Sequence, residues 1–387
     1  MTPWLWLESP ATRTVEVTAP ERAADLLTSA ATMILVTGGA GYVGSVLVPE
    51  LLDLGESVRV VDAMWFDAAP QPHPRLEVIP GDIREFDEAW LTDVHAVIHL
   101  AGLSNDPTAD FAPALNADVN VRATRRLAEM VARRAHGEGR DIRFVFASSC
   151  SVYYTAVQAI DLDIQPKLED SPAAPSAHYS KTKRLAELEL LKLAREEPRF
   201  CPVLLRKGTL FGRAPRMRFD LVVNTFTLHA WQKRQVTVHG SGEAWRPLLH
   251  VRDAVDAYVF CLAAPQDRVR EQIFNVLRKN YRTLELAHWV AEIIERHRGV
   301  AIQVRRDRSI ESGARSYYVV GRKITEQIGF QAERGTTKAV LEMWDALEAG
   351  VFGQQPSDNP AFFNIRWFKE RCAGVMSPPA SAPVAVS

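Results

Sequence analysis

The residues best suited to chemistry are a tyrosine and a lysine four positions apart, Tyr179 and Lys183, in the sequence YSKTK. On a helix this spacing places both side chains on one face. A phenol is a poor base, but a nearby ammonium favours the phenolate and makes tyrosine a usable acid or base near neutral pH. Ser149, at the end of an apolar segment, could hydrogen-bond the reacting oxygen or simply cap a strand. The three residues predict a proton-transfer site, although YxxxK alone also arises by chance.

A second candidate site is the glycine-rich turn TGGAGYVG near the start of the chain. It lies between an apolar, strand-like segment and an amphipathic, helix-like one, and its glycines have the spacing GxxGxxG. In this context glycines allow a tight turn and a close backbone approach to a diphosphate, which the following helix N-terminus attracts. We therefore expect a dinucleotide to contact Gly38, Gly41, Tyr42, Val43 and Gly44.

An acidic residue, Asp62, ends the next predicted strand. Its carboxylate can accept hydrogen bonds from both ribose hydroxyls of NAD and would repel the 2′-phosphate of NADP. No arginine or lysine follows before Arg75, so the sequence favours NAD, although an aspartate that begins a turn is the alternative. Further cofactor contacts are expected at the ends of later strands, at Asp82, Ile83, Leu100, Ala101 and Gly102.

Composition excludes several other classes of function. Lys plus Arg number 46 and Asp plus Glu 47, so the chain has no global field for nucleic acid or an acidic membrane, and neither partner is expected. No apolar run approaches the roughly 20 residues that a membrane helix needs. The four cysteines show neither a CxxC pair nor metal-ligand spacing. We expect no metal, and we interpret the cysteines as free thiols of a cytoplasmic protein.

The elements that must position these residues alternate between apolar strands and amphipathic helices. Short, nearly all-apolar strands are typical of a parallel sheet covered on both faces. The pattern predicts an α/β fold, a Rossmann-type doubly wound parallel sheet with a smaller C-terminal substrate-binding lobe. Strands are expected at 33–37, 58–62, 76–79, 96–101, 144–148 and 203–206. The expected domains are an N-terminal extension (1–32), a dinucleotide-binding domain (33–213, with 247–264 returning to it), the lobe (214–246 and 265–360) and a partly disordered C-terminal tail (361–387).

Taken together, these motifs resemble the extended short-chain dehydrogenase/reductases, in particular the NAD-dependent nucleotide-sugar epimerase/dehydratase family. The resemblance covers roughly residues 33–345 and includes GDI, HLAG, SSCSVY, LRKGTLFG and RPLLHVRD. It implies a Ser149/Tyr179/Lys183 triad, a bound NAD, a nucleotide-sugar substrate between the lobes, and a homodimer joined by helices at 112–135 and 179–196. It also implies a cofactor contact at Asn120 and substrate contacts at Ser104, Ser151, Thr209, Asn224, Arg246 and Arg315.

Departures from the family pattern narrow the reaction. Sugar-nucleotide 4,6-dehydratases carry an Asp–Glu pair just after the catalytic hydroxyl, where this chain has Cys150 and Ser151. The family's 3,5-epimerases have a cysteine two residues past the serine. Cys150 is one past Ser149, which on a strand reverses its face, so we interpret it as structural. Lys207 stands where the family often has an aromatic or amide residue near the nicotinamide, and could be a substrate anchor or simply a variant.

Three functions remain. In an epimerase, Tyr179 takes a hydroxyl proton, hydride passes to NAD, the keto sugar turns, and hydride returns to the other face. The alternative is an NAD(H)-dependent reductase or dehydrogenase of a nucleotide keto sugar, which exchanges its cofactor at every turnover. A non-catalytic NAD-binding protein is the third, but such proteins typically lose the tyrosine or the lysine, and this chain keeps both. We favour the epimerase.

Overall fold

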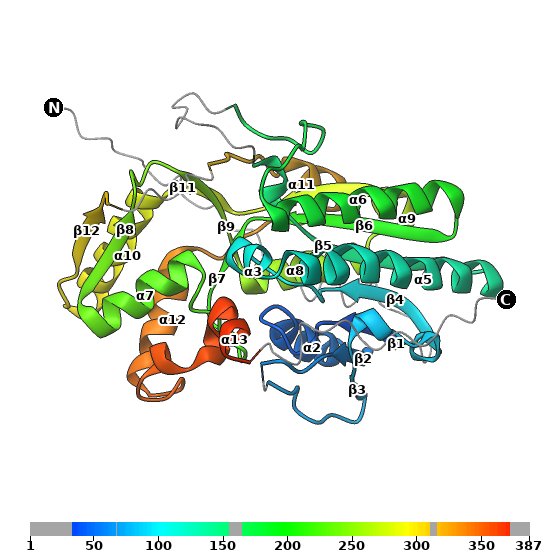
Figure 1. The fold of residues 1–387 in the computed structure, drawn as a ribbon, viewed down its shortest axis with the longest axis horizontal. Helices are drawn as coiled ribbons and strands as arrows, with labels where there is room; N and C mark the ends of the chain where they lie inside the picture. The colour runs from blue at the N-terminus through cyan, green and yellow to red at the C-terminus, as the bar shows by residue number, and fades with distance from the viewer. Residues whose placement is uncertain (1–32, 67, 155–164, 310–315, 372–387) are drawn as a thin grey trace, which may run out of the picture.

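The computed structural model describes residues 33–66, 68–154, 165–309 and 316–371. Its central layer is a parallel sheet of seven strands in the order β10-β6-β5-β4-β1-β2-β3, with helices on both faces (Figure 1). Because the strand order reverses between β1 and β4, the carboxyl ends of these strands flank a crevice, as in Rossmann folds. The predicted fold class is confirmed. The strands are β1 (Met33–Thr37), β2 (Ser57–Asp62), β3 (Leu76–Pro80), β4 (Val94–His99), β5 (Ile142–Ser149), β6 (Phe200–Lys207) and β10 (Gln272–Val276).

Two layers of helices bury the two faces of the sheet. Along β1, Ile34 and Val36 face one hydrophobic cluster, whereas Leu35 between them faces another. This alternation explains why the strands read as continuous apolar runs. Helices α5 (Thr124–Glu138) and α6 (His178–Glu196) cover one face, and α2 (Gly44–Asp53) and α8 (Val251–Ala263) cover the other. Short segments connect them: η1 (Ile83–Glu85), η2 (Glu88–Leu91), α3 (Asp106–Phe111), α4 (Pro113–Ala117), the π-helical η3 (Asp118–Ala123) and η4 (Cys150–Tyr153).

The seventh strand was not predicted from the sequence. β10 pairs in parallel with β6 at the edge of the sheet, with Phe274 beside Leu205. Residues 272–276 therefore belong to the central sheet and not to the lobe, where the sequence analysis placed them. The sequence QIFNV is a short apolar segment whose partner strand only the tertiary pairing identifies. α9 (Gln266–Val269) precedes this strand, and α11 (Arg322–Ile328) packs against it.

The smaller lobe contains two small sheets and three longer helices. The first sheet has the order β11-β9-β7, and the second pairs β12 with β8. Its core is continuous with that of the central sheet, since Trp344 and Ile34 belong to one hydrophobic cluster. Its elements are β7 (Thr209–Phe211), α7 (Val222–Lys233), β8 (Gln235–His239), β9 (Trp245–His250), β11 (Lys279–Arg282), α10 (Thr283–Arg298), β12 (Gln303–Asp307), α12 (Thr336–Glu348), η5 (Pro356–Asp358) and η6 (Pro360–Phe362).

A final helix, α13 (Asn364–Arg371), lies where the sequence analysis expected the C-terminal tail to begin. Its Trp367 and Phe368 are buried against Trp65, with ring centroids 6.0 and 5.3 Å from the Trp65 ring. The tail boundary at residue 361 is therefore wrong, because the partner of this amphipathic segment lies far away in the sequence. The predicted N-terminal extension, residues 1–32, lies outside the described residues.

Candidate active site

A cavity of about 510 Å³ opens at the carboxyl ends of the central strands, between the sheet and the lobe. The glycine turn, Ser149, Tyr179 and Lys183 all line it. A smaller cavity of about 100 Å³ shares several lining residues with it and contains Asp62. The structure thus brings the two candidate sites of the sequence, the proton-transfer residues and the glycine turn, into one crevice.

The glycine turn can be built only with glycine at its tightest points. Gly38 has φ +77°, and a Cβ atom there would lie 2.6 Å from the Ala101 backbone nitrogen. A Cβ at Gly44 would lie 2.5 Å from the Gly38 carbonyl oxygen. These contacts hold the turn against β4 and leave its outer side open to the cavity, which Gly41, Tyr42 and Val43 also line. Helix α2 begins at Gly44, so its positive dipole end is available to a diphosphate.

Asp62 lies at the end of β2, in the smaller cavity. Its carboxylate accepts hydrogen bonds from the Ala40 and Met64 backbone amides, at 3.0 and 2.8 Å. Burial raises the pKa of Asp62, and these amides and the Arg216 charge oppose that rise. The other cofactor contacts predicted at the ends of later strands line the same cavity: Asp82, Ile83, Leu100, Ala101 and Gly102.

Ser149 and Tyr179 form the centre of the proton-transfer site. Ser149 ends β5 and Tyr179 lies in the first turn of α6, and both residues line the large cavity. Burial, followed by the Asp106 carboxylate, raises the pKa of Tyr179 and outweighs the lowering by Arg218 and Ser149. In this arrangement Tyr179 is therefore a phenol at neutral pH. This differs from the phenolate expected from its spacing to Lys183, because burial disfavours the charged form.

Lys183 lies one turn further along α6 and is buried, with only 4% of its surface exposed. Its ammonium lies 4.8 Å from the centre of the Phe146 ring. Burial lowers the pKa of Lys183 to about 8, and the Glu187 carboxylate opposes that shift. A Cβ at Gly102 would approach the Lys183 ammonium to 3.4 Å, so the glycine of HLAG leaves space beside it.

A buried ion pair that the sequence analysis missed fixes these elements relative to one another. Glu187, on α6, accepts from the Arg206 Nε and Nη2 atoms at 2.8 and 2.7 Å, and from the Ser148 hydroxyl at 2.6 Å. It thereby joins α6 to the ends of both β5 and β6. Since Ser148 precedes Ser149, the pair holds the serine beside Tyr179. Neither residue stands out in the sequence, because LRK and an AEL helix segment look unremarkable.

Asn120 acts from behind the cavity and does not line it. Its side chain is 1% exposed, accepts from the Leu103 amide at 2.9 Å and donates to the Leu103 carbonyl at 3.0 Å. Its amide nitrogen also lies 3.3 Å from the Thr182 hydroxyl. The predicted cofactor contact is therefore replaced by a positioning role, in which Asn120 fixes the backbone next to Gly102.

The predicted substrate residues divide into three groups. Ser104, Ser151, Thr209 and Arg246 line the large cavity as expected. Asn224 does not: it is fully buried, accepts from the Gly212 amide at 3.0 Å and donates to the Arg218 carbonyl and the Tyr42 hydroxyl. The prediction for Asn224 is wrong in this structure, because its amide is already hydrogen-bonded within the protein. Arg315 lies outside the described residues.

The structure also places Lys207 and Cys150, whose roles were left open. Lys207 stands opposite Ser149 in the sheet, lines the large cavity and donates to the Tyr258 hydroxyl at 2.6 Å. Burial and the neighbouring Lys183 charge lower the pKa of Lys207 to about 7. Cys150 is fully buried, does not line the cavity, and donates to the Arg206 carbonyl. Burial raises the pKa of Cys150, which agrees with a structural thiol.

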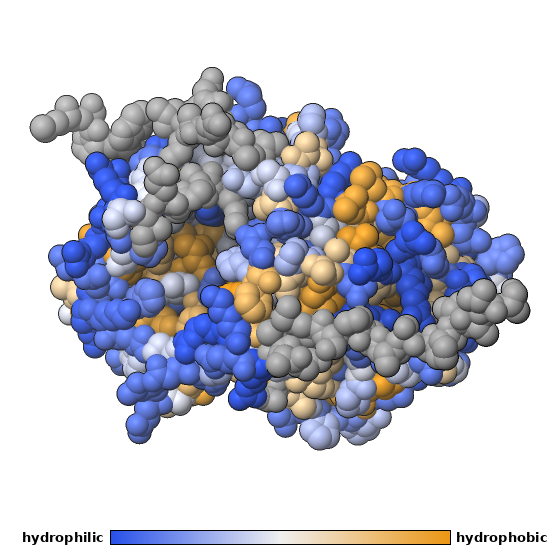
Figure 2. Space-filling model, viewed as in Figure 1, coloured by the Kyte–Doolittle hydropathy of each residue, from blue (hydrophilic) through white to orange (hydrophobic). Residues whose placement is uncertain are grey.

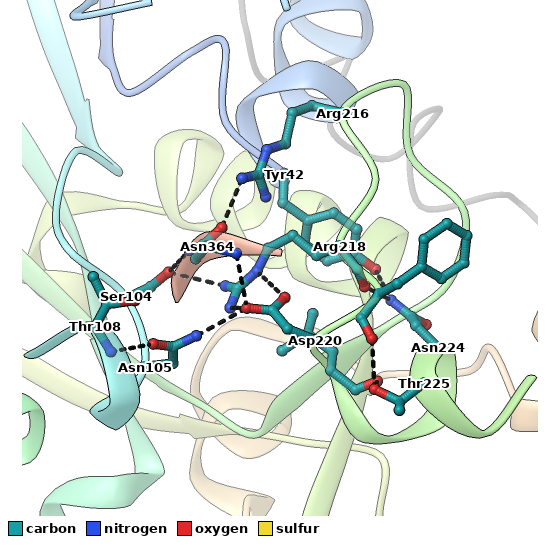
Figure 3. A network of polar contacts seen from close by, with 12 residues as sticks. Tyr42, Ser104, Asn105, Thr108, Arg216, Arg218, Asp220, Asn224, Thr225 and Asn364 are labelled. Atoms are coloured by element: carbon teal, nitrogen blue, oxygen red, sulfur yellow. Dashed lines mark hydrogen bonds and ion pairs between the residues drawn. The ribbon is translucent and has the colours of Figure 1, made fainter. Parts of the chain in front are cut away.

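Two arginines that the sequence analysis did not select reach the crevice from the loop after β7 (Figure 3). Arg218 makes a two-pronged ion pair with Asp220, at 2.9 Å for both bonds, and donates to the Ser104 hydroxyl. Arg216 donates to the Asn364 side chain on α13 at 2.6 Å. The only signal in the sequence is PRMRFD, in which two arginines flank an apolar residue.

Residues 34–276 of the chain match the NAD dependent epimerase/dehydratase family. The chain belongs to this family. Membership confirms the family predicted from the sequence and NAD as its cofactor. The glycine turn fits that cofactor, since Gly38, Gly41 and Gly44 line the large cavity at the N-terminus of α2. Within the described residues no group of three or more potential ligands could hold a metal, and no helix is long and apolar enough to cross a membrane.

Individual relatives in the family carry out different reactions. UDP-glucuronic acid decarboxylase 1 of Xenopus tropicalis is 30% identical over 239 residues, which are 58% of this chain and 52% of that protein. The chain thus spans about half the length of that relative. UDP-glucose 4-epimerase of Bacillus subtilis is 25% identical over 353 residues, 84% of this chain and 99% of the relative. The structure of MoeE5 in complex with UDP-glucose and NAD is 25% identical, with a TM-score of 0.67 over 82% of this chain and 99% of that one.

Proposed function

We propose that the protein is an NAD-dependent epimerase of a nucleotide-activated sugar. One observation carries the proposal: Ser149, Tyr179 and Lys183 line the same cavity as the glycine turn, and neither residue after Ser149 is a carboxylic acid. Dehydration would require an acid and a base at those positions. Cys150 is buried away from the cavity and Ser151 has only a hydroxyl, so the site favours oxidation and reduction without elimination.

The residues of the chain divide the proton chemistry among them. Tyr179 exchanges a proton with the reacting sugar oxygen, and Ser149 hydrogen-bonds the same oxygen. Lys183 contributes a positive charge that favours removal of the phenol proton and can hold the nicotinamide ribose. Bound NAD supplies the acceptor and the donor of the hydride. Epimerisation requires the keto sugar to turn within the cavity before the hydride returns.

Basic side chains on the lobe side of the cavity indicate the class of substrate. Arg246, on β9, lines it, and its positive charge supports a role in binding a nucleotide diphosphate. Lys207, opposite Ser149 in the sheet, adds a second amine, which is fully charged only below its lowered pKa of about 7. The relatives named for UDP-glucose and UDP-glucuronic acid make these two nucleotide sugars the first substrates to test. We propose a UDP-sugar, held with its diphosphate toward the lobe and its sugar toward Tyr179.

The decisive experiment is turnover in D₂O without added NAD(H), followed by NMR of UDP-glucose and UDP-glucuronic acid. An epimerase gives the epimer, and the inverted carbon carries no deuterium because the hydride returns from the bound cofactor. A requirement for one NADH per product identifies the reductase instead. Loss of CO₂ or water contradicts the proposal in favour of a decarboxylase or dehydratase. The matched control is Tyr179→Phe, which keeps the ring and removes the hydroxyl.

We also propose a homodimer joined through α5 and α6, in a cytoplasmic setting. Helices α5 and α6 pack side by side, and Leu185 and Leu188 on α6 are 50% and 47% exposed. Figure 2 shows a hydrophobic patch over this helix. Exposed leucines on one helix face support a contact with a second copy. Free buried thiols such as Cys150, Cys201 and Cys261 suit a reducing compartment.

A further inference from the structure

The crevice contains a buried cation with no carboxylate bonded to it in the described part of the chain. Arg216 is 4% exposed, and its guanidinium lies 3.7 Å from the centre of the Phe66 ring. Its Nη2 atom donates to the neutral Asn364 side chain, while its buried Nε atom has no hydrogen-bond partner among the described residues. Arg218, two residues later, differs because Asp220 neutralises it through two hydrogen bonds.

Burying such a charge is unfavourable unless an anion accompanies it. The surroundings of Arg216 disfavour its positive charge. Burial and the charge of Arg218 lower the pKa of Arg216 to about 9, whereas the pKa of an arginine is ordinarily above 12. Asp220 and Asp62 oppose the shift but do not cancel it. A negatively charged ligand bound beside Arg216 would offset this cost.

The position of Arg216 indicates which ligand that is. Its backbone amide donates to the Ser45 hydroxyl at 3.2 Å, in the first turn of α2. Asp62 and Tyr42 lie close enough to influence the pKa of Arg216. Its side chain lines the large cavity together with Gly41 and Val43. Arg216 thus lies between the glycine turn and the carboxylate expected at the adenosine ribose, where a dinucleotide carries its diphosphate.

We propose that Arg216 binds the diphosphate of NAD and, together with Phe66 and helix α13, forms a clasp that keeps NAD bound between turnovers. The clasp is defined by Phe66, Arg216, Asn364 and Phe368, all of which line the large cavity. This inference rests on the proposed function, since an epimerase returns the hydride to the same sugar and gains nothing by releasing its cofactor. The nucleotide sugar also carries a diphosphate, which the proposed function assigns to the lobe side of the cavity, where Arg246 lies on β9.

Three distant segments make up the clasp. Phe66 follows β2, Arg216 follows β7, and Asn364 lies 148 residues beyond Arg216. Aromatic contacts join the outer two segments, since Phe66 packs on Trp367 with ring centroids 5.1 Å apart. Asn364 also donates to the Ser104 hydroxyl, which ties α13 to the loop after β4. Release of a cofactor from beneath these contacts requires α13 to separate from the β2 loop.

The test compares Arg216→Met, Arg216→Lys and a matched control, Arg213→Met, in the full chain. Arg213 belongs to the same loop but is exposed and does not line the cavity. Calorimetry measures affinity for NAD, ADP-ribose and UDP, and thermal melting measures stability without ligand. We expect Arg216→Met to bind NAD and ADP-ribose about 10–100-fold more weakly, as expected for loss of a charged hydrogen bond. UDP affinity stays unchanged, Arg216→Lys recovers part of the loss, and Arg213→Met behaves as wild type.

The stability readout separates ligand binding from a structural role. In Arg216→Met the cost of burying a charge disappears and offsets the lost hydrogen bond to Asn364, so we expect little change in the melting temperature of the ligand-free protein, whereas loss of a purely structural arginine would lower it. NAD affinity equal to wild type in Arg216→Met overturns the proposal. A loss confined to UDP assigns the arginine to the substrate diphosphate and overturns it as well. All these readouts are independent of activity, so failure of the epimerase assay alone leaves a confirmed clasp in place.

Retention is measured separately, from the rate at which bound NAD is replaced by a competing nucleotide. Phe368→Ala removes an aromatic contact of α13 without touching the diphosphate contact. We expect this variant to release NAD faster while ADP-ribose affinity changes little, because the opening of the clasp becomes easier. An unchanged release rate in both Phe368→Ala and Arg216→Met shows that NAD leaves by another route and overturns the clasp.

Discussion

Lys207 offers a quantitative test of the electrostatics of the catalytic cavity. The pKa of its ammonium is lowered from 10.5 to about 7 by burial and by the charge of Lys183. A folded-state pKa below the unfolded value means that the unfolded chain binds more protons between these limits, so stability rises with pH from about 7 to 10.5. Below pH 7 the Lys207 ammonium is charged in both the folded and the unfolded state. The full cost of burying this charge then lowers the free energy of unfolding.

The perturbation is Lys207→Met, which keeps the length and removes the charge. One pH unit of pKa difference corresponds to about 1.4 kcal/mol, and the partial exposure of the side chain reduces the effect. We subtract the free energy of unfolding of the variant from that of the wild type. We expect this difference to increase by about 1–3 kcal/mol between pH 6 and pH 9. Loss of the hydrogen bond to Tyr258 adds a penalty to the variant, but that penalty does not depend on pH.

The assay is urea unfolding of both proteins at several pH values, with the difference in free energy plotted against pH. Lys338→Met is the control, because the Lys338 side chain is 84% exposed and its replacement should give a flat difference. A flat difference for Lys207→Met as well would refute the reasoning, since it would mean that Lys207 carries no buried charge. If the wild type instead lost stability relative to Lys207→Met as the pH rises, the predicted direction of the pKa shift would be wrong.

The remaining predictions concern chemistry, cofactor choice and assembly. Tyr179→Phe should fold and bind NAD as wild type but turn over roughly 10²–10⁴-fold more slowly, as measured by steady-state kinetics, because general acid/base catalysis is lost. Lys183→Ala should reduce both turnover and NAD affinity, a combination that Tyr179→Phe should not show. Asp62→Ala should weaken NAD by roughly 1.5–3 kcal/mol in calorimetry, and a wild type that binds NADP as tightly as NAD would contradict the assignment. Light scattering should report a dimer at micromolar concentration that the double variant Leu185→Glu/Leu188→Glu converts to a monomer, whereas a monomeric wild type would disprove the interface.

The patterns that can be found from the sequence are local ones. The glycine turn, Asp62 and the Tyr179–Lys183 pair each depend on spacing within one strand–turn–helix unit or one helix, and such short patterns survive without knowledge of the fold. The six predicted strands were found for the same reason, because each is a short apolar run between helical segments. Pairing of parallel strands then follows from the alternation of elements.

Sequence reasoning failed where function depends on contacts between distant segments. Nothing near Arg216 shows that its partner is Asn364, and nothing near residue 361 shows that an aromatic loop after β2 will receive α13. Asn224 was misplaced because its type suits a ligand contact, whereas its three hydrogen bonds are to the protein itself. The helical spacing also could not show the burial that raises the pKa of Tyr179, because burial is a tertiary property.

The shared core limits how this protein could be recombined with its relatives. One hydrophobic cluster extends from Ile34 on β1 through Phe274 on β10 to Trp344 on α12, so the sheet and the lobe do not have separate interiors. A chimaera that exchanged only the lobe, in order to import another sugar preference, would place unmatched side chains against the old sheet, and cores tolerate such mismatches poorly. Substrate preference in this scaffold is therefore altered more readily at single cavity positions, such as Thr209 and Lys207, than by grafting a whole lobe.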